Sequence, residues 1–327
     1  MKTFLKILKW MGIIVLLIIG GLVAIVYARH DRHFQAPLPD IKASTDSAVI
    51  ARGKYLVYGP GHCNYCHGTN EEVARMKQGE TLPLAGGYLF DIPIGKLYTP
   101  NITPDPETGI GKLSDAEIAR ALRYGVNHRG EAMLEFMSFQ NASDEDLAAI
   151  ISYIRSMPPV KRELPAKEYN FLGKAISAFV LKPSGPAATP PQSVKIDSTA
   201  DYGKYLATSI ANCRGCHTPR DMMTGAYIGP DFSGGERFNS ETGGKEQYVS
   251  ANLTPDKESG HIAGWSEEAF IQRFRRGRFY AGSPMPWESY GRMSDSDLKA
   301  IYRYLQTVQP IRNHTGPTYI PADSTKQ

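Results

Sequence analysis

Two five-residue segments of the chain combine paired thiols with an imidazole. They hold all four cysteines of the 327 residues and are Cys63-Asn64-Tyr65-Cys66-His67 and Cys213-Arg214-Gly215-Cys216-His217. Two intervening residues place both thiols on one side of a tight turn, and the histidine follows directly. This pattern is typical of covalent haem attachment, in which the thiols bond the two vinyl groups of one porphyrin and the imidazole ligates the iron. The sequence therefore predicts two covalently bound haem c groups, with His67 and His217 as proximal ligands.

Two other uses of paired cysteines fit the sequence less well. A zinc site would need a second Cys-x-x-Cys pair about 15–20 residues away, whereas the two pairs here are 150 residues apart, from Cys63 to Cys213. A thioredoxin-like redox site would need a parallel βαβ context, which the surrounding residues do not suggest. Haem attachment is therefore the prediction for both segments.

The sixth ligand of each iron decides what a haem can do, and methionine is the candidate in both halves of the chain. A methionine sulfur opposite histidine raises the reduction potential and closes the iron to small molecules, which suits electron transfer. Met285 lies between Pro284 and Pro286, a setting poorly suited to a helix core. We therefore expect Met285 to ligate the second haem.

The first half of the chain offers two methionines, Met133 and Met137. The spacing from Gly125 favours Met133, because it equals the spacing from Gly277 to Met285. Counting from the proximal histidine barely discriminates, since the separations are 66 residues for Met133 and 70 for Met137, against 68 for Met285. The residues alone leave the choice open.

The chain repeats itself with an offset of 150 or 151 residues. Gly53-Lys54-Tyr55-Leu56 recurs as Gly203-Lys204-Tyr205-Leu206, and Asn101-Ile102-Thr103-Pro104-Asp105 recurs as Asn252-Leu253-Thr254-Pro255-Asp256. The run 143–160 also matches the run 294–311 without a gap. Repetition at one fixed spacing predicts homologous units, which we place at residues 45–160 and 197–312.

Within each repeat the hydrophobic pattern is helical. Amphipathic segments begin in the manner of capped helices at Ser114, Ser143, Ser266 and Ser294. The segments around Tyr55 and Tyr205 are expected to be helices that enter the thiol-containing turns. No run of strands is evident, so the predicted fold is all-α, with two tandem domains that each wrap about three to five helices around one haem.

The remaining segments are predicted to be connectors. Residues 29–44 lead into the first domain, the proline-rich residues 161–196 form a semi-stiff spacer, and residues 313–327 form a polar tail. Residues 169–181 could form a short amphipathic helix that docks on a domain or on a membrane. A plain surface connector is the alternative for that stretch.

The N-terminal segment has the composition of a membrane-spanning helix. Residues 10–27 are apolar or glycine throughout, which is about the minimum length that crosses a bilayer. Lys2, Lys6 and Lys9 precede it, so the positive-inside tendency places the N-terminus in the cytoplasm and the rest outside. We expect residues 1–28 to be a transmembrane anchor. A cleaved signal peptide is the alternative, because Val26-Tyr27-Ala28 resembles a cleavage site.

The overall composition excludes one large class of partner. The chain is 42% hydrophobic and carries a net charge of +4, of which three charges lie in the first nine residues. The remainder is nearly neutral and has no basic stripe with interleaved aromatic residues, so nucleic-acid binding is not expected.

Taken together, these features resemble the c-type cytochromes of bacterial membranes, and especially the cytochrome subunits of membrane-bound alcohol, aldehyde and gluconate dehydrogenases. The resemblance covers residues 45–160 and 200–311. It rests on the Gly-x-Tyr-Leu, Cys-x-x-Cys-His and Asn-x-Thr-Pro-Asp motifs, the methionine loop, and Ser-Asp-x-Asp-Leu at the last helix. It implies two domains similar to class I cytochrome c. Those subunits carry three haem domains, whereas this chain has two repeats.

The resemblance also bears on the ligands of the first haem. In such cytochromes the methionine commonly lies in the form Phe-Met-Pro-Tyr/Phe, and Phe136-Met137-Ser138-Phe139 occupies that place here. This favours Met137 over Met133, although Ser138 replaces the usual proline. The family further suggests that the Asn-x-Thr-Pro-Asp loops line the haem edge, with Tyr or Arg side chains on the propionates. A purely structural turn is the alternative.

The expected function is electron carriage and not catalysis. We expect a dihaem cytochrome held by one span in the bacterial inner membrane, with the bulk of the chain in the periplasm. It would pass single electrons from a dehydrogenase or quinol donor to an acceptor such as a terminal oxidase or a soluble cytochrome. The alternative is a dihaem peroxidase-like enzyme with an open haem in the first domain, suggested by the irregular loop around Met137.

Overall fold

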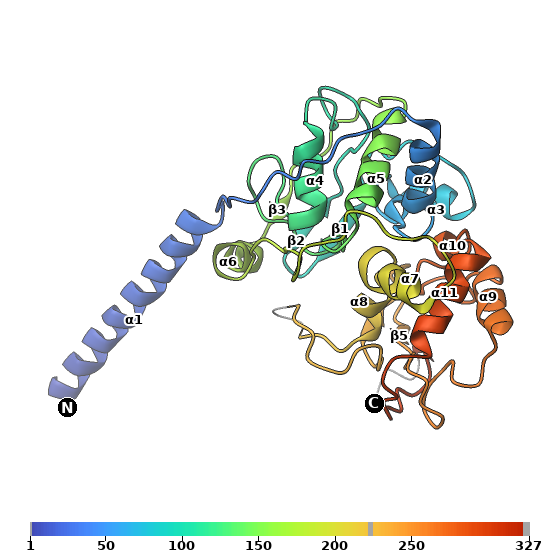
Figure 1. Cartoon of the computed structure of the whole chain (residues 1–327). Helices are drawn as coiled ribbons and strands as arrows, with labels where there is room; N and C mark the ends of the chain where they lie inside the picture. The colour runs from blue at the N-terminus through green and yellow to red at the C-terminus, as the bar shows by residue number, and fades with distance from the viewer. Residues whose placement is uncertain (1, 222–224, 323–327) are drawn as a thin grey trace.

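The computed structural model describes residues 2–221 and 225–322, and in it two helical domains lie against each other with one long helix projecting from them (Figure 1). The first domain contains α2 (Ser47–Tyr58), α3 (Asn70–Lys77), α4 (Asp115–Tyr124) and α5 (Asp144–Ser156). The second contains α7 (Ala200–Tyr205), α8 (Cys213–His217), α9 (Glu267–Arg275), α10 (Trp287–Tyr290) and α11 (Asp295–Leu305). Between them in sequence lies α6 (Phe171–Phe179).

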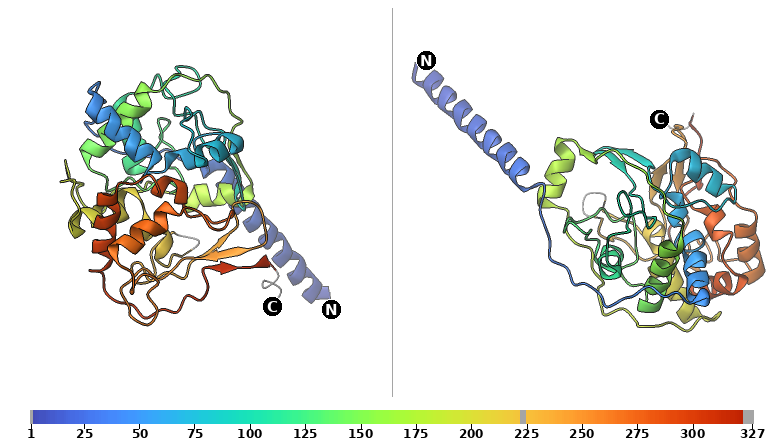
Figure 2. Two further views of the ribbon diagram at one scale, coloured as in Figure 1. Left: turned by 90° about the vertical axis from the view of Figure 1, so that its right-hand side faces the viewer. Right: turned by 90° about the horizontal axis from the view of Figure 1, so that it is seen from above.

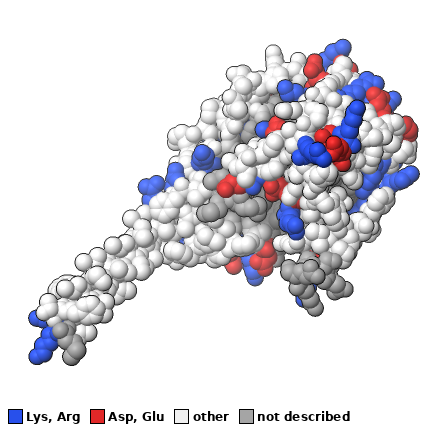
Figure 3. Space-filling model, turned by 90° about the horizontal axis from the view of Figure 1, so that it is seen from below, with Lys and Arg blue, Asp and Glu red and all other residues white. Residues whose placement is uncertain are grey.

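The projecting helix is α1 (Lys2–Arg29), and its side chains are almost all exposed. It is the one helix among the described residues that is long and apolar enough to cross a membrane, a test that a signal sequence near the N-terminus also passes. Figure 3 shows it as an uncharged rod with lysine and arginine only at its ends. This supports the predicted apolar span and leaves the choice between anchor and signal peptide open.

The helix starts that the sequence predicted are confirmed. Ser114, Ser143, Ser266 and Ser294 are all N-caps whose side chains accept a hydrogen bond from a backbone N–H in the first turn. Such a bond satisfies one of the N–H groups that a helix start leaves without an internal partner. α4 ends as expected at Gly125, where φ of +62° suits glycine.

A pair of crossing helices forms the frame of each domain, α2 with α5 and α7 with α11. Gly53 and Gly203 lie at the two crossings. A Cβ on Gly53 would lie 1.9 Å from the carbonyl oxygen of Ala149, and one on Gly203 would lie 1.8 Å from that of Ala300. The first residue of the repeated Gly-Lys-Tyr-Leu motif is therefore glycine because the helix backbones touch there.

The all-α prediction is only roughly right, because each domain also carries a small antiparallel sheet. One sheet has the order β1 (Leu89–Ile92), β2 (Gly95–Tyr98), β3 (Glu168–Tyr169), and the other β4 (Arg237–Asn239), β5 (Gln247–Val249), β6 (Tyr319–Ile320). Strands of two to four residues are too short to display an alternating pattern. The third strand of each comes from the segments expected to be a spacer and a polar tail. Residues 323–327 of that tail lie outside the described residues.

The same tyrosine–aspartate hydrogen bond joins the two domains twice, once in each direction. The Tyr55 hydroxyl on α2 donates to Asp297 of the second domain at 2.5 Å, and the Tyr205 hydroxyl on α7 donates to Asp146 of the first at 2.8 Å. Both aspartates are buried, so each needs such a donor. The repeated Tyr and Asp positions thereby hold the two domains together by two reciprocal hydrogen bonds. Figure 2 shows the chain from two further sides.

Candidate haem-binding sites

Both thiol-containing segments form a tight helical turn directly after a residue with a left-handed backbone conformation. The first is a single 3₁₀ turn, η1 (Cys63–Tyr65), and the second is α8, which follows a π-helical turn, η2 (Leu206–Ile210). His62 and Asn212 precede the turns in the left-handed region, with φ of +40° and +49°. This conformation is uncommon outside glycine, and asparagine and histidine tolerate it better than most residues. The left-handed residue reverses the chain so that both thiols and the following imidazole belong to one turn.

The two proximal histidines have the same hydrogen bond. His67 Nδ1 lies 3.0 Å from the carbonyl oxygen of Pro100, and His217 Nδ1 lies 2.8 Å from that of Ala251. Because a carbonyl only accepts, Nδ1 must carry the proton, which leaves Nε2 free to ligate a metal. Burial lowers the pKa of both imidazoles and so favours the neutral form that ligation needs. The acceptors Pro100 and Ala251 were not foreseen, although both directly precede the repeated Asn-x-Thr-Pro-Asp motif.

A cavity of about 470 Å³ lies in the second domain between α8 and residues 283–286, the methionine loop. Its walls are mostly apolar and include Cys213, Cys216, His217 and Met285. This volume is in the range of cofactor sites. Two thiols and an imidazole on one turn, with a thioether in the same cavity, are the donor set of a covalent haem with axial methionine. The residues of the second domain therefore fit haem c.

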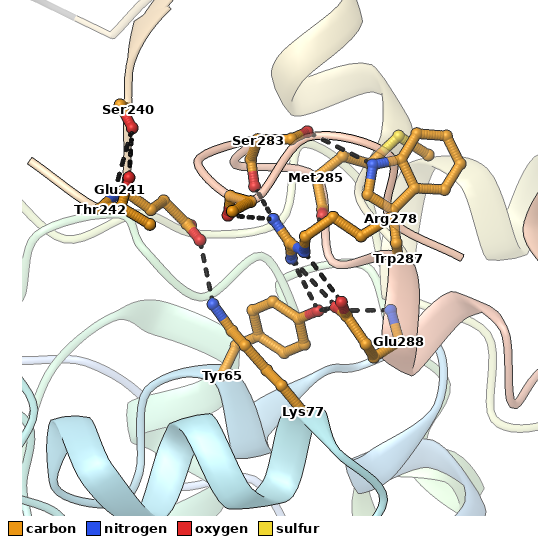
Figure 4. Close-up of polar contacts among 11 residues, drawn as sticks. Tyr65, Lys77, Ser240, Glu241, Thr242, Arg278, Ser283, Met285, Trp287 and Glu288 are labelled. Carbon is orange, nitrogen blue, oxygen red and sulfur yellow. Dashed lines mark hydrogen bonds and ion pairs between the residues drawn. The ribbon is translucent and has the colours of Figure 1, made fainter. Parts of the chain in front are cut away.

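Arg278 holds the methionine loop of the second domain in place (Figure 4). Its guanidinium donates to the carbonyl oxygens of Ser283 and of Met285, the latter at 3.2 Å, and forms a two-pronged ion pair with Glu288 at 2.8 and 3.0 Å. Burial alone would raise the pKa of the Glu288 carboxyl, but the bonds from Arg278 and Tyr65 outweigh it and hold that pKa below its usual value. Sequence analysis did not single out Arg278, because it follows Gly277 whereas Val126 follows Gly125 in the first repeat.

The first Cys-x-x-Cys-His turn contacts Arg278 and α10, the short helix that follows the methionine loop. Arg278 also donates to the Tyr65 hydroxyl at 3.1 Å, and Tyr65 donates to Glu288. Beside them the Ser289 hydroxyl donates to Asn64 at 3.0 Å. Asn64 and Tyr65 are the two residues between Cys63 and Cys66, so the first Cys-x-x-Cys-His turn meets, across the domain boundary, the arginine that binds the second methionine loop.

The structure places the two methionines of the first domain differently. Met137 is half-buried and packs against the hydrophobic core, as Met285 does in the second domain. Met133 lies on the turn after α4, where its backbone N–H donates to the carbonyl of Gly125 at 2.7 Å. Counting from that glycine favoured Met133 as the ligand. Both methionines are half-buried, but of the two only Met137 packs against the hydrophobic core of the described residues.

The Asn-x-Thr-Pro-Asp loops are chiefly structural turns. Asn101 Nδ2 donates to the carbonyl of Val160 at 2.7 Å, and Asn252 Nδ2 donates to that of Ile311 at 2.8 Å. These bonds tie each loop to the chain that leaves the last helix of its domain. In the second domain Leu253 also lines the cavity. The arginine on that cavity wall is Arg273 of α9 and does not belong to the loop.

Neither alternative use of the cysteines gains support. All four are free, with no disulfide among them. Among residues 2–221 and 225–322, no three His, Cys, Asp or Glu side chains come together as a mononuclear metal site would require.

Comparison with known families agrees with this geometry. Residues 48–154 match the model of cytochrome c oxidase, cbb3-type, subunit III, and residues 200–309 match that of cytochrome c. The chain belongs to the c-type cytochromes. Each matched region contains one complete Cys-x-x-Cys-His turn, so this cytochrome has two cytochrome c domains.

The relatives of this cytochrome are mainly subunits of dehydrogenases. It is 30% identical to the gluconate 2-dehydrogenase cytochrome c subunit of Pantoea cypripedii, over 84% of this chain and 62% of that one. It is 30% identical to the cytochrome c subunit of the quinone-dependent alcohol dehydrogenase of Gluconacetobacter polyoxogenes, over 85% and 60%. A dihaem c-type cytochrome of Cereibacter sphaeroides is 25% identical over 80% and 86%. The chain thus spans about three fifths of the two dehydrogenase subunits.

Proposed function

We propose that this cytochrome is a membrane-anchored dihaem electron carrier that passes single electrons between a donor and an acceptor protein. The observation that carries the proposal is the cavity of the second domain, because it brings two thiols, a histidine and a methionine together in an apolar space. A bound haem supplies one-electron oxidation and reduction. The chain supplies covalent attachment, axial ligands and exclusion of water.

Each residue has one role in this proposal. Cys63, Cys66, Cys213 and Cys216 attach the two haems, and His67 and His217 ligate the irons from one side. Met285 ligates the second iron from the other side, and Met137 the first, because both sulfur-bearing side chains pack against the core of their domain. The domains that hold the haems are residues 45–160 and 197–312.

α1 and the relatives support the proposed place of electron transfer. α1 anchors the chain by one span, and the lysines before it keep the N-terminus in the cytoplasm, so both domains face the periplasm. The relatives named as dehydrogenase subunits support a dehydrogenase or quinol donor. A terminal oxidase or a soluble cytochrome is the acceptor. These relatives do not favour the peroxidase-like alternative.

Haem counting and carbon monoxide binding test the proposal on the full chain purified from membranes. We expect two haem c groups per chain and no binding of carbon monoxide by the native protein, because methionine closes both irons. Met285→Ala and Met137→Ala should each open one haem to carbon monoxide, measured by the optical spectrum of the reduced protein.

Met133→Ala is the matched control for Met137→Ala and should leave both haems closed. Ready binding of carbon monoxide by the native protein would contradict the carrier and support an open haem. Opening of the first haem by Met133→Ala, with Met137→Ala silent, would transfer the ligand role to Met133.

A further inference from the structure

α6 is fixed to the first domain at its N-terminal end. The backbone N–H of its N-cap, Asn170, donates to the carbonyl of Ile94 at 3.1 Å, and the Asn170 side chain donates to that of Pro93 at 2.8 Å. Gly173 lies so close to the backbone of Ile94 that a Cβ on it would be 2.2 Å from the Ile94 carbonyl oxygen. These contacts join α6 to the turn between β1 and β2, so the helix moves with the first domain.

α6 also contacts the C-terminal end of α1 and the residues that follow it. The Ser177 hydroxyl donates to the carbonyl of His30 at 2.6 Å, and the rings of Phe171 and Tyr27 lie 6.5 Å apart. α6 is seen end-on in Figure 1 while α1 runs along the picture, so α6 crosses the end of the long helix. If α1 stands upright in a membrane, α6 lies along the surface of that membrane.

The residues that α6 leaves exposed are large and apolar. They are Phe171 and Leu172, each 51% exposed, Phe179, 53% exposed, and the C-cap Val180, 41% exposed. Leu172 and Phe179 are seven residues apart and therefore share a face of the helix. In water such a group costs free energy, because apolar side chains gain by leaving it.

Three cations lie where α6 meets the end of α1. The Lys174 ammonium lies 4.4 Å from the centre of the Tyr27 ring, and the Arg29 guanidinium lies 5.7 Å from that of Phe179. Arg32 donates to the carbonyl of Ala178 at 3.0 Å. Large apolar side chains beside basic ones are the composition of helices that lie in the interface of a bilayer, with phosphate groups near the cations.

We propose that α6 is an interfacial helix whose Phe171, Leu172, Phe179 and Val180 enter the outer leaflet and whose neighbouring cations meet lipid phosphates. α6 then acts as a second membrane contact, and through Asn170 and Gly173 it fixes how the first domain faces the bilayer. This inference rests on the proposed membrane anchor, because the depth of α6 is set by α1.

Photocrosslinking of the full haem-containing chain tests this surface. The photoreactive p-benzoylphenylalanine replaces one residue per variant, at Phe171, Phe179, Leu17 or Ile196. Each variant is reconstituted in nanodiscs of phosphatidylethanolamine and phosphatidylglycerol. Leu17, which is 71% exposed on α1, serves as the lipid-facing reference. Ile196, which is 56% exposed on the spacer before α7, is the matched control. Haem content confirms folding of each variant, and mass spectrometry of peptides measures lipid adducts.

The inference predicts lipid adducts at Leu17, Phe171 and Phe179, with yields several-fold above that at Ile196. Adducts at Leu17 with only the Ile196 background at both α6 positions would overturn the α6 contact and leave the anchor standing. Crosslinks from Phe171 and Phe179 to a second copy of the chain would likewise overturn it. Absence of lipid adducts at Leu17 as well would overturn the anchor and, with it, this inference.

Discussion

The two domains of this cytochrome share one frame and differ in what surrounds it. In both, two helices cross at a glycine, and a histidine Nδ1 is hydrogen-bonded to a backbone carbonyl. In both, an asparagine side chain also donates a hydrogen bond to the chain that follows the last helix. They differ at the methionine. Met285 lies between two prolines on a loop that Arg278 binds at two carbonyls, whereas Met137 precedes a serine. The two domains therefore share the frame that carries the Cys-x-x-Cys-His turn and differ in the segment that carries the methionine.

The largest expected effect tests the shared frame. Gly53→Ala and Gly203→Ala should each destabilise their domain by about 3 kcal/mol, at the upper end of the cost of overpacking, because the added Cβ would meet a carbonyl at less than 2 Å. Guanidinium unfolding of the haem-containing protein measures the loss. Gly264→Ala, whose Cβ would meet open space, is the control. A large loss for only one of the two glycines would contradict a common frame.

The next effect tests the difference between the loops. Arg278→Gln should destabilise the protein by about 2 kcal/mol, because it leaves Glu288 without its ion pair, and should weaken the Met285–iron bond. The potential of the second haem and the absorption band of methionine-ligated ferric haem report that bond. The potential of the first haem should change less.

Arg303→Gln supplies the matched control for Arg278→Gln, because Arg303 pairs with Glu267 on the exposed faces of α11 and α9. An unchanged second potential in Arg278→Gln would show that the two prolines suffice to hold the loop.

The smallest effect tests how each domain fixes the chain that leaves its last helix. In the first domain Arg162 donates to both Glu72 oxygens at 2.7 Å and to the Gly86 carbonyl at 2.9 Å. In the second, the neutral Asn313 donates to the Ser233 carbonyl at 3.0 Å. The Arg162 bond holds the pKa of the Glu72 carboxyl below its usual value of 4.5. The Arg162–Glu72 pair has no charged counterpart at the Asn313 side chain, so the first clamp should respond to acid more strongly than the second.

A lowered pKa in the folded state contributes stability that is present above pH 4.5 and is lost as the pH falls below it. The protection of the amides around Arg162, expressed relative to their intrinsic exchange rates, should accordingly fall below pH 4.5, and it should fall less around Asn313. Glu72→Gln should remove the acid effect at Arg162. Equal acid sensitivity of both segments would refute the distinction between a charged and a neutral clamp.

The haem-attachment turns, their histidines and the duplicated frame could be predicted because their signals are local. Cys63 to His67 and Cys213 to His217 are fixed by covalent spacing, and serine caps mark helix starts by a bond within one turn. The short strands could not be predicted, because β3 and β6 depend on pairing with residues far away in the sequence. The same holds for Pro100 and Ala251, whose role depends on a carbonyl and not on a side chain.

The sequence by itself determined the two Cys-x-x-Cys-His turns, the repeat and the apolar N-terminal span. Only the tertiary structure decided how the repeats combine. Tyr55 and Tyr205 each donate a hydrogen bond to an aspartate of the other domain. Tyr65 of the first Cys-x-x-Cys-His turn accepts a hydrogen bond from Arg278, which also binds the Met285 carbonyl. The tertiary structure also brought α6 to the end of α1. The physical reason is range, since spacing and capping act within a few residues, whereas buried charges and exposed apolar faces find their partners only after the chain has folded.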